Sequence, residues 1–263
     1  MQNAVMSAFF ASIICGIIGT IVIEKNLVMM SGGIAHTSFG GIGLGYYLEF
    51  EPLLGGLVFA VFSAISIVKI KNKTTTKSDT LIGLFWSVGM ALGILFISFT
   101  PGYPPTMSTY LFGDILTTSR LDVIFAGLLA FFILFMIGSY YNYWKAYLFD
   151  DEFLAVLGIN TGFIEYFLFI LIAFAIVVLI KLVGIILVIA LLTAPAAIAR
   201  IFTYSLKKMM ITAVILSMFF AGMGLYLSYN FDVPSGATII LLAGGSYILI
   251  AIFKNIIRNN FMG

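Results

Sequence analysis

The sequence has 263 residues, of which 62% are hydrophobic and only 9% charged, and its mean hydropathy is +1.16. A soluble globular domain is excluded, because about a quarter of its residues would be charged. The net charge of +2 is not gathered into a basic region, which argues against a nucleic-acid partner. The single cysteine, Cys15, allows neither a disulfide framework nor a thiolate metal cluster. The composition therefore predicts an all-α, polytopic integral membrane protein surrounded by membrane lipid.

Nine apolar segments approach or reach the roughly 17 to 25 residues that a helix needs to cross a bilayer core of about 30 Å. They cover residues 4–23, 29–48, 52–68, 80–99, 121–138, 163–180, 182–199, 209–228 and 236–253. We therefore expect about nine transmembrane helices (eight to ten) in a single transmembrane domain over residues 1–263.

The basic residues predict how these helices are oriented. Of the 13 Lys and Arg residues, only Arg120 and Lys181 fall in the connections on one side of a nine-span arrangement. Basic connections stay in the cytoplasm, so we expect the N-terminus outside and the C-terminus inside. The outer connections are then acidic overall. Two interpretations are open: the negative charge concentrates cations at the outer mouth, or the acidity only reflects the shortage of basic residues on this side.

The second apolar segment leads into the stretch SGGIAHTSFGGIGLGYYLEFEP (Ser31–Pro52), which holds the only histidine, His36. An ionisable side chain at bilayer depth is a candidate functional residue. Two interpretations remain open: the imidazole lines a transport path, or it is a neutral group hydrogen-bonded between helices and packed against Gly40 and Gly43. Small residues every four positions predict close helix packing, and these are Gly33, Thr37, Gly41 and Gly45.

The longest inner connection, near residues 145–160, contains the sequence FDDEFLAVLGIN. A short helical pattern here begins with acidic residues, which interact favourably with the helix dipole, and ends at Gly158, which can form a C-cap. We expect Phe153, Leu154 and Leu157 to project from this helix. A short helix between two spans gains little in isolation, which favours docking into a groove of a soluble partner.

Several stretches, in order and over nearly the whole chain, carry a resemblance to a known family: SGGIAHTSFGGIGLGYYL, TYLFGDIL, FDDEFLAVLGIN, GIILVIALLTAPAAIAR and SYNFDVPSGATIILL. The chain resembles the permease subunit of ABC transporters for zinc, manganese and related metal ions. The resemblance implies an ABC importer permease fold, a homodimer seated on two ATPase subunits, an extracytoplasmic metal-binding protein, and the plasma membrane of a prokaryote. Because the chain has no Walker lysine motif, we expect ATP hydrolysis on the separate subunit, no enzymatic activity here, and no permanently bound cofactor.

The resemblance also implies roles for particular residues. The loop that matches the family's ATPase-coupling helix contributes Asp151, Glu152, Phe153, Ala155, Leu157 and Gly158. In the family, the segment equivalent to IAHTSFGG carries an imidazole taken to line the metal path, often with an aspartate four residues earlier, where this chain has Gly32. A dimer would supply two copies of His36, and carboxylates near the outer mouth would come from Glu49, Glu51 and Asp114.

These observations lead to an expected function and to alternatives. We expect ATP-driven import of a divalent metal, with zinc ahead of manganese and iron, since Zn²⁺ accepts imidazole and carboxylate ligands. The alternatives are a secondary transporter driven by an ion gradient and an ABC permease for a metal complex or another small solute. An intramembrane metalloenzyme is disfavoured, because the sequence has no HExxH motif and no second histidine.

Overall fold

The computed structural model describes residues 2–73, 78–102, 110–111, 113 and 115–262, and these form helices and connections only. The elements are α1 (Gln2–Glu24), α2 (Val28–Tyr47), α3 (Pro52–Lys73), α4 (Ser78–Phe99), η1 (Ile115–Thr117), α6 (Arg120–Ser139), α7 (Tyr141–Phe149), α8 (Asp151–Val156), α9 (Thr161–Val183), α10 (Ile185–Phe202), α11 (Leu206–Phe231) and α12 (Ser235–Met262). The expected all-α class is confirmed, and each expected span corresponds to one long helix.

Eight helices of the described chain are long and apolar enough to cross a membrane, namely α1, α3, α4, α6, α9, α10, α11 and α12. The remaining long helix, α2, has 20 residues, but its glycines and His36 lower its hydropathy. Most helices extend beyond the apolar stretches seen in the sequence. The reason is that low hydropathy marks the edge of the hydrocarbon core, whereas the helix itself continues into the interface.

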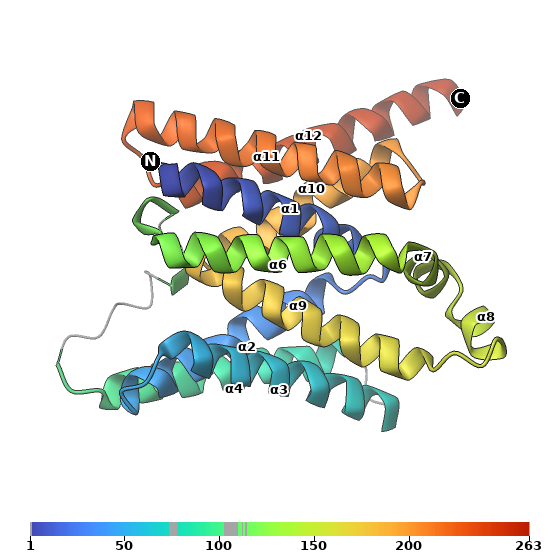
Figure 1. The fold of residues 1–263 in the computed structure, drawn as a ribbon. Coiled ribbons are helices and arrows are strands. Elements are labelled where there is room, and N and C mark those ends of the chain that lie inside the picture. Colours follow the sequence, from blue (N-terminus) through green and yellow to red (C-terminus); the bar gives the residue numbers. More distant parts are fainter. Residues whose placement is uncertain (1, 74–77, 103–109, 112, 114, 263) are drawn as a thin grey trace.

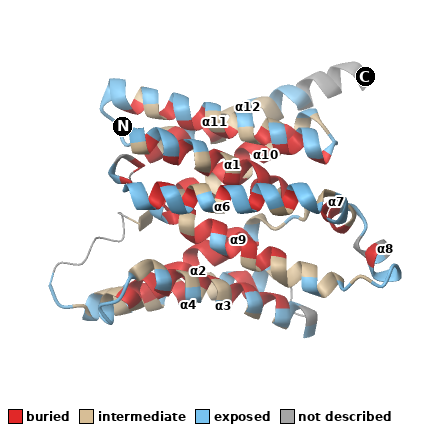
Figure 2. Ribbon diagram, in the orientation of Figure 1, coloured by how far each residue is buried: buried red, intermediate tan, exposed pale blue. Residues whose placement is uncertain are grey.

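The helices pack as two groups (Figure 1). In one group α2 contacts both α3 and α4, and in the other α1 contacts α6, α10 and α11, while α12 packs on α10 and α11. Helices α9 and α10 join the groups, since both contact α1 and α2. Figure 2 shows that burial is concentrated in α1, α2, α9 and α10, whereas α6 carries a long exposed stripe. Thus α2, the long helix that does not belong to the set of eight named above, is shielded by its neighbours.

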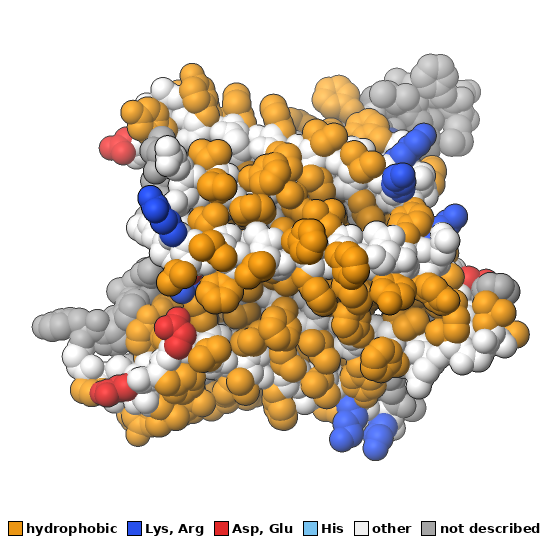
Figure 3. Space-filling model, viewed as in Figure 1, with side chains coloured by type: hydrophobic (Ala, Val, Ile, Leu, Met, Phe, Trp, Pro, Cys, Tyr) orange, Lys and Arg blue, Asp and Glu red, His pale blue; other side chains and the backbone are white. Residues whose placement is uncertain are grey.

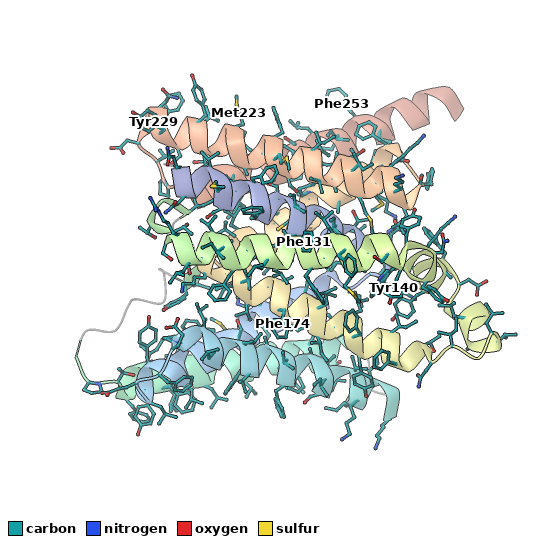
Figure 4. The ribbon with its side chains drawn as sticks, viewed as in Figure 1. Phe131, Tyr140, Phe174, Met223, Tyr229 and Phe253 are labelled. Carbon is teal, nitrogen blue, oxygen red and sulfur yellow. The ribbon has the colours of Figure 1, made fainter. Side chains whose placement is uncertain are left out.

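Charged side chains lie mainly at the two ends of the bundle, separated by a wide hydrophobic surface (Figure 3). One end of the bundle, called the basic end below, carries Lys71, Arg200, Lys207 and Lys254. The opposite end, called the acidic end, carries Glu49, Glu51, Asp122 and Asp232. Tyr140 lies toward the basic end and Tyr229 toward the acidic end, whereas Phe131 projects from the middle of α6 (Figure 4). Tyrosines at both ends and apolar side chains between them are the distribution expected of a membrane-spanning bundle.

Small residues bring α2 close to both of its partners, as the four-residue spacing predicts. A Cβ on Gly41 would collide with the backbone of Gly55 in α3, and a Cβ on Gly43 would lie 2.5 Å from the Gly93 carbonyl oxygen in α4. Backbones this close maximise van der Waals contact where no hydrophobic force drives helix association in lipid. The glycines therefore set the position of His36 relative to α4.

Candidate functional site

His36 lies near the middle of α2 and is only 8% exposed. Its imidazole stacks on the indole of Trp86 in α4, with ring centroids 4.1 Å apart and planes 8° apart. Within the described chain, its Nδ1 atom is buried and has no hydrogen-bond partner. A buried polar atom without a partner costs about 1–3 kcal/mol. The hydrogen-bonded structural role considered above is therefore not fulfilled at Nδ1 among the described residues.

A hydrogen bond between α2 and α4 holds these two rings opposite each other. The Thr37 hydroxyl shares its proton between two acceptors, the Gly33 carbonyl in its own helix at 2.7 Å and the Phe85 carbonyl in α4 at 3.0 Å. Phe85 immediately precedes Trp86, and Thr37 immediately follows His36. The residues next to the two rings are thus tied to each other, which leaves little freedom for the stack.

The position four residues before His36 is occupied by Gly32 and has room for a side chain. A Cβ on Gly32 would make ordinary contacts, 3.9 Å from Cζ3 of Trp86 and 3.9 Å from Cδ1 of Ile189 in α10. Sterics therefore do not explain the missing second ligand. In the part of the chain that the structure describes, no group of three or more His, Cys, Asp or Glu side chains could hold a metal. A single described chain thus offers one imidazole in largely apolar surroundings.

The two described carboxylates of the predicted mouth, Glu49 and Glu51, lie away from His36 within one chain. Glu49 follows His36 by 13 positions, or about 20 Å of helical rise, and is exposed in a left-handed conformation with φ 57°. Glu51 lies 3.8 Å from the Lys181 ammonium, and Asp114 lies outside the described residues. The two described carboxylates therefore belong to the rim of the acidic end, whereas the imidazole lies deeper.

A tyrosine pair covers the acidic end of α2, and sequence reasoning missed it. The hydroxyl groups of Tyr46 and Tyr110 are hydrogen-bonded, and the Tyr110 ring packs edge-on against Phe39 with centroids 6.5 Å apart. Burial, followed by the hydrogen bond with Tyr46, raises the pKa of Tyr110, so the phenol stays protonated. The two rings are partly buried and pack against the core of the bundle, so they contribute hydroxyl groups and no carboxylate at this end of α2.

The short helix α8 at the basic end forms and ends as predicted. Gly158 has φ 76°, its N–H donates to the Ala155 carbonyl at 3.0 Å, and the N–H of Ile159 donates to the Leu154 carbonyl at 3.1 Å. This pattern is a Schellman C-cap. One detail of the prediction is wrong: Leu154 does not project but is 2% exposed, because it packs into the core.

The other residues of the predicted coupling segment are presented outward where they are described. Glu152, Ala155, Leu157 and Gly158 are exposed, Leu157 by 58%, while the side chains of Asp151 and Phe153 lie outside the described part. The preceding helix α7 anchors the segment from inside. In α7, Trp144 packs near Phe167 of α9, and the Lys25 ammonium lies 4.3 Å from the Tyr147 ring centroid.

Besides the tyrosine pair, the sequence did not predict the contact of Trp86 with His36 or the Lys181–Asp122 ion pair at 2.8 Å. A signal for Trp86 was available, because Trp86, Gly89 and Gly93 share one helical face at spacings of three and four. A glycine-lined face packs against another helix, so a tryptophan on it must meet that helix. No comparable signal existed for Lys181 and Asp122, which are 59 positions apart in the sequence.

Comparisons with known proteins agree with this architecture. The profile of the ABC 3 transport family matches residues 1–254. An uncharacterized membrane protein of Synechocystis is 40% identical over 254 residues, covering 97% of this chain and 90% of that protein. The manganese transport system membrane protein MntC of Listeria monocytogenes is 31% identical, with coverage of 92% and 86%. The solved PsaBC structure from Streptococcus pneumoniae, in complex with Fab, contains a chain that superposes with a TM-score of 0.83 at 30% identity, covering 95% of this chain and 90% of that one.

Proposed function

The chain belongs to the ABC 3 transport family as the membrane permease of a metal-ion ABC import system, and on that basis we propose that its cargo passes the imidazole of His36. The observation that carries the proposal is the buried Nδ1 atom without a partner at bilayer depth. Neutral imidazole is a good ligand for divalent transition metals. A single ligand also binds weakly, as transport requires, because the ion must leave again.

Manganese is the cargo that we propose first, ahead of the zinc that the sequence reasoning favoured. One imidazole and no described carboxylate beside it leave most coordination positions to water or carbonyl oxygen, and Mn²⁺ accepts such oxygen ligands more readily than Zn²⁺ does. The relative from Listeria monocytogenes, named as a manganese transport protein, supports the same choice. Two copies of the chain, related by a two-fold axis, would bring a second imidazole to the path.

In this proposal the partners occupy opposite ends of the bundle. A metal-binding protein delivers the ion to the acidic end, which faces outward, and an ATPase subunit receives α8 at the basic end, in the cytoplasm. ATP-driven movement of α8 reaches the bundle through α7. The contact of Tyr147 with Lys25 links α7 to the connection between α1 and α2. Helix α2 carries His36, so closure of the ATPase changes which end of the path the imidazole faces.

The experiment that tests the proposal compares His36→Ala with the parent in cells that express the complete transport system. Cellular manganese, zinc and iron are measured by mass spectrometry after growth at limiting metal. Ser38→Ala is the matched control, because Ser38 is buried in the same helix and bonds only to the Ala35 carbonyl at 2.6 Å. The proposal expects loss of manganese accumulation in His36→Ala alone. Unchanged accumulation of all three metals would assign His36 a structural role.

A further inference from the structure

The tryptophan that faces His36 is the feature that carries a further inference. The imidazole and the indole form a parallel stack with planes 8° apart, which fixes the orientation of the imidazole plane. A metal ion must approach a ring nitrogen within that plane, because the lone pair of the nitrogen lies in it. Trp86 is half-buried and stands on the glycine-lined face of α4 that packs on α2. The stack is therefore built into the helix contact, so the orientation of the imidazole plane depends on Trp86.

We propose that Trp86 is a positioning residue for the metal path, which fixes the plane of the His36 imidazole and thereby the directions from which an ion can reach a ring nitrogen. This inference rests on the function proposed above and adds a residue to it. Trp86 offers no ligand atom to a metal, because the indole N–H is a donor only. Its contribution is geometric and electrostatic.

Two physical effects favour an aromatic ring at this position. A flat ring limits rotation of the imidazole about its χ2 bond, which otherwise has a broad energy profile. The π face of an indole also carries partial negative charge, and an imidazole that binds a cation becomes partly positive, so the stack strengthens when metal binds. A leucine or methionine side chain, which is much closer in size to phenylalanine than to tryptophan, has neither effect, so the two aliphatic variants are compared with Trp86→Phe. This contrast separates positioning from simple packing.

The chain makes a direct test possible, because it contains a single histidine. The full-length chain is labelled with ¹⁵N-histidine, placed in lipid nanodiscs and observed by NMR. In the parent, the ring current of Trp86 shields the imidazole protons, and added MnCl₂ broadens the signal. Trp86→Phe keeps a π face, and its midpoint, the manganese concentration that gives half-maximal broadening, is expected to lie within about twofold of the parent value. Trp86→Leu is expected to lose the shielding and to raise the midpoint about three- to tenfold.

The controls make each outcome decisive. Val88 is on the same helix but 55% exposed, so Val88→Ala should match the parent. Trp86→Met provides a second aliphatic variant if Trp86→Leu does not fold. Lost shielding with an unchanged manganese midpoint in the aliphatic variants would overturn the role of Trp86 and leave the proposed function intact. Absence of broadening in the parent would instead overturn the proposed function itself, because it would show that manganese does not reach the His36 imidazole.

Discussion

The ammonium of Lys181 lies 2.8 Å from the carboxylate of Asp122, and this ion pair joins the last turn of α9 to the first turn of α6. Asp122 is 9% exposed and also accepts hydrogen bonds from Ser119, in a capping box at the start of α6. Lys181 approaches Glu51 on the connection between α2 and α3 as well. One lysine therefore ties three parts of the acidic end together.

We predict that Lys181→Met destabilises the protein more than Asp122→Asn does. The first change leaves a nearly buried carboxylate without its cation, whereas asparagine keeps an oxygen that can accept from Ser119. The half-exposed lysine reduces the effect through solvent screening, so the loss is expected at about 1–2 kcal/mol. Thermal unfolding in detergent measures it. An equal or higher melting temperature for Lys181→Met would show that the pair is not a stabilising contact.

A second prediction concerns the glycines of α2. Gly41→Ala should strongly reduce the amount of folded protein, because the added methyl group would collide with the backbone of Gly55 in α3. Gly32→Ala serves as the control in the same helix, since its Cβ would make only ordinary van der Waals contacts, and it should be neutral or slightly stabilising. Expression and monodispersity by size-exclusion chromatography compare the two. Similar yields for both variants would contradict the close packing of α2 on α3.

A third prediction uses the space beside Trp86. Gly32→Asp places a carboxylate four positions before His36, on the same helical face, and should give a metal two ligands from one chain. We expect tighter metal binding, by about tenfold or more, with slower net transport because release becomes harder. Metal titration and uptake rates check the two effects, and Gly32→Asn is the uncharged control. Weaker binding in Gly32→Asp than in Gly32→Asn would place the path away from this face of α2.

A fourth prediction addresses α8. Leu157→Asp changes an exposed apolar side chain and should leave folding intact, but it should reduce the stimulation of ATP hydrolysis in the assembled complex several-fold. Leu154→Asp is the contrasting variant, because it would bury a charge in the core and should prevent folding. ATPase assays with and without the permease measure the coupling. Full stimulation by folded Leu157→Asp would mean that α8 does not dock through this surface.

The fold was largely predictable, since apolar segments of membrane-spanning length are visible in the sequence. The close contact of α2 with α3 and α4 was also predictable, because Gly33, Thr37 and Gly41 recur every four residues. The rotation of most helices was not. In a membrane both the protein-facing and the lipid-facing sides are apolar, so no amphipathic pattern distinguishes them. For that reason the sequence left open which ring Trp86 would contact. The direction of Leu154 was predicted wrongly for another reason: α8 is a short helix with apolar side chains on more than one face, and the sequence does not show which of them packs into the core.

The site was predictable only in part, for a related physical reason. An isolated histidine among apolar residues draws attention because burying an ionisable group is costly. What surrounds it depends on contacts between distant positions, such as His36 with Trp86 or Tyr46 with Tyr110. Such contacts follow from how whole helices pack, and residue types and spacing within one helix carry little information about them.

We propose that this chain passes a metal ion only as the permease of an ATP-driven importer. Uptake of radioactive manganese is measured in proteoliposomes that contain the permease with its ATPase subunit and metal-loaded binding protein. We expect uptake that requires ATP and all three components and that is lost in His36→Ala. Manganese uptake by the permease alone, driven by a proton or sodium gradient without ATP, would contradict it.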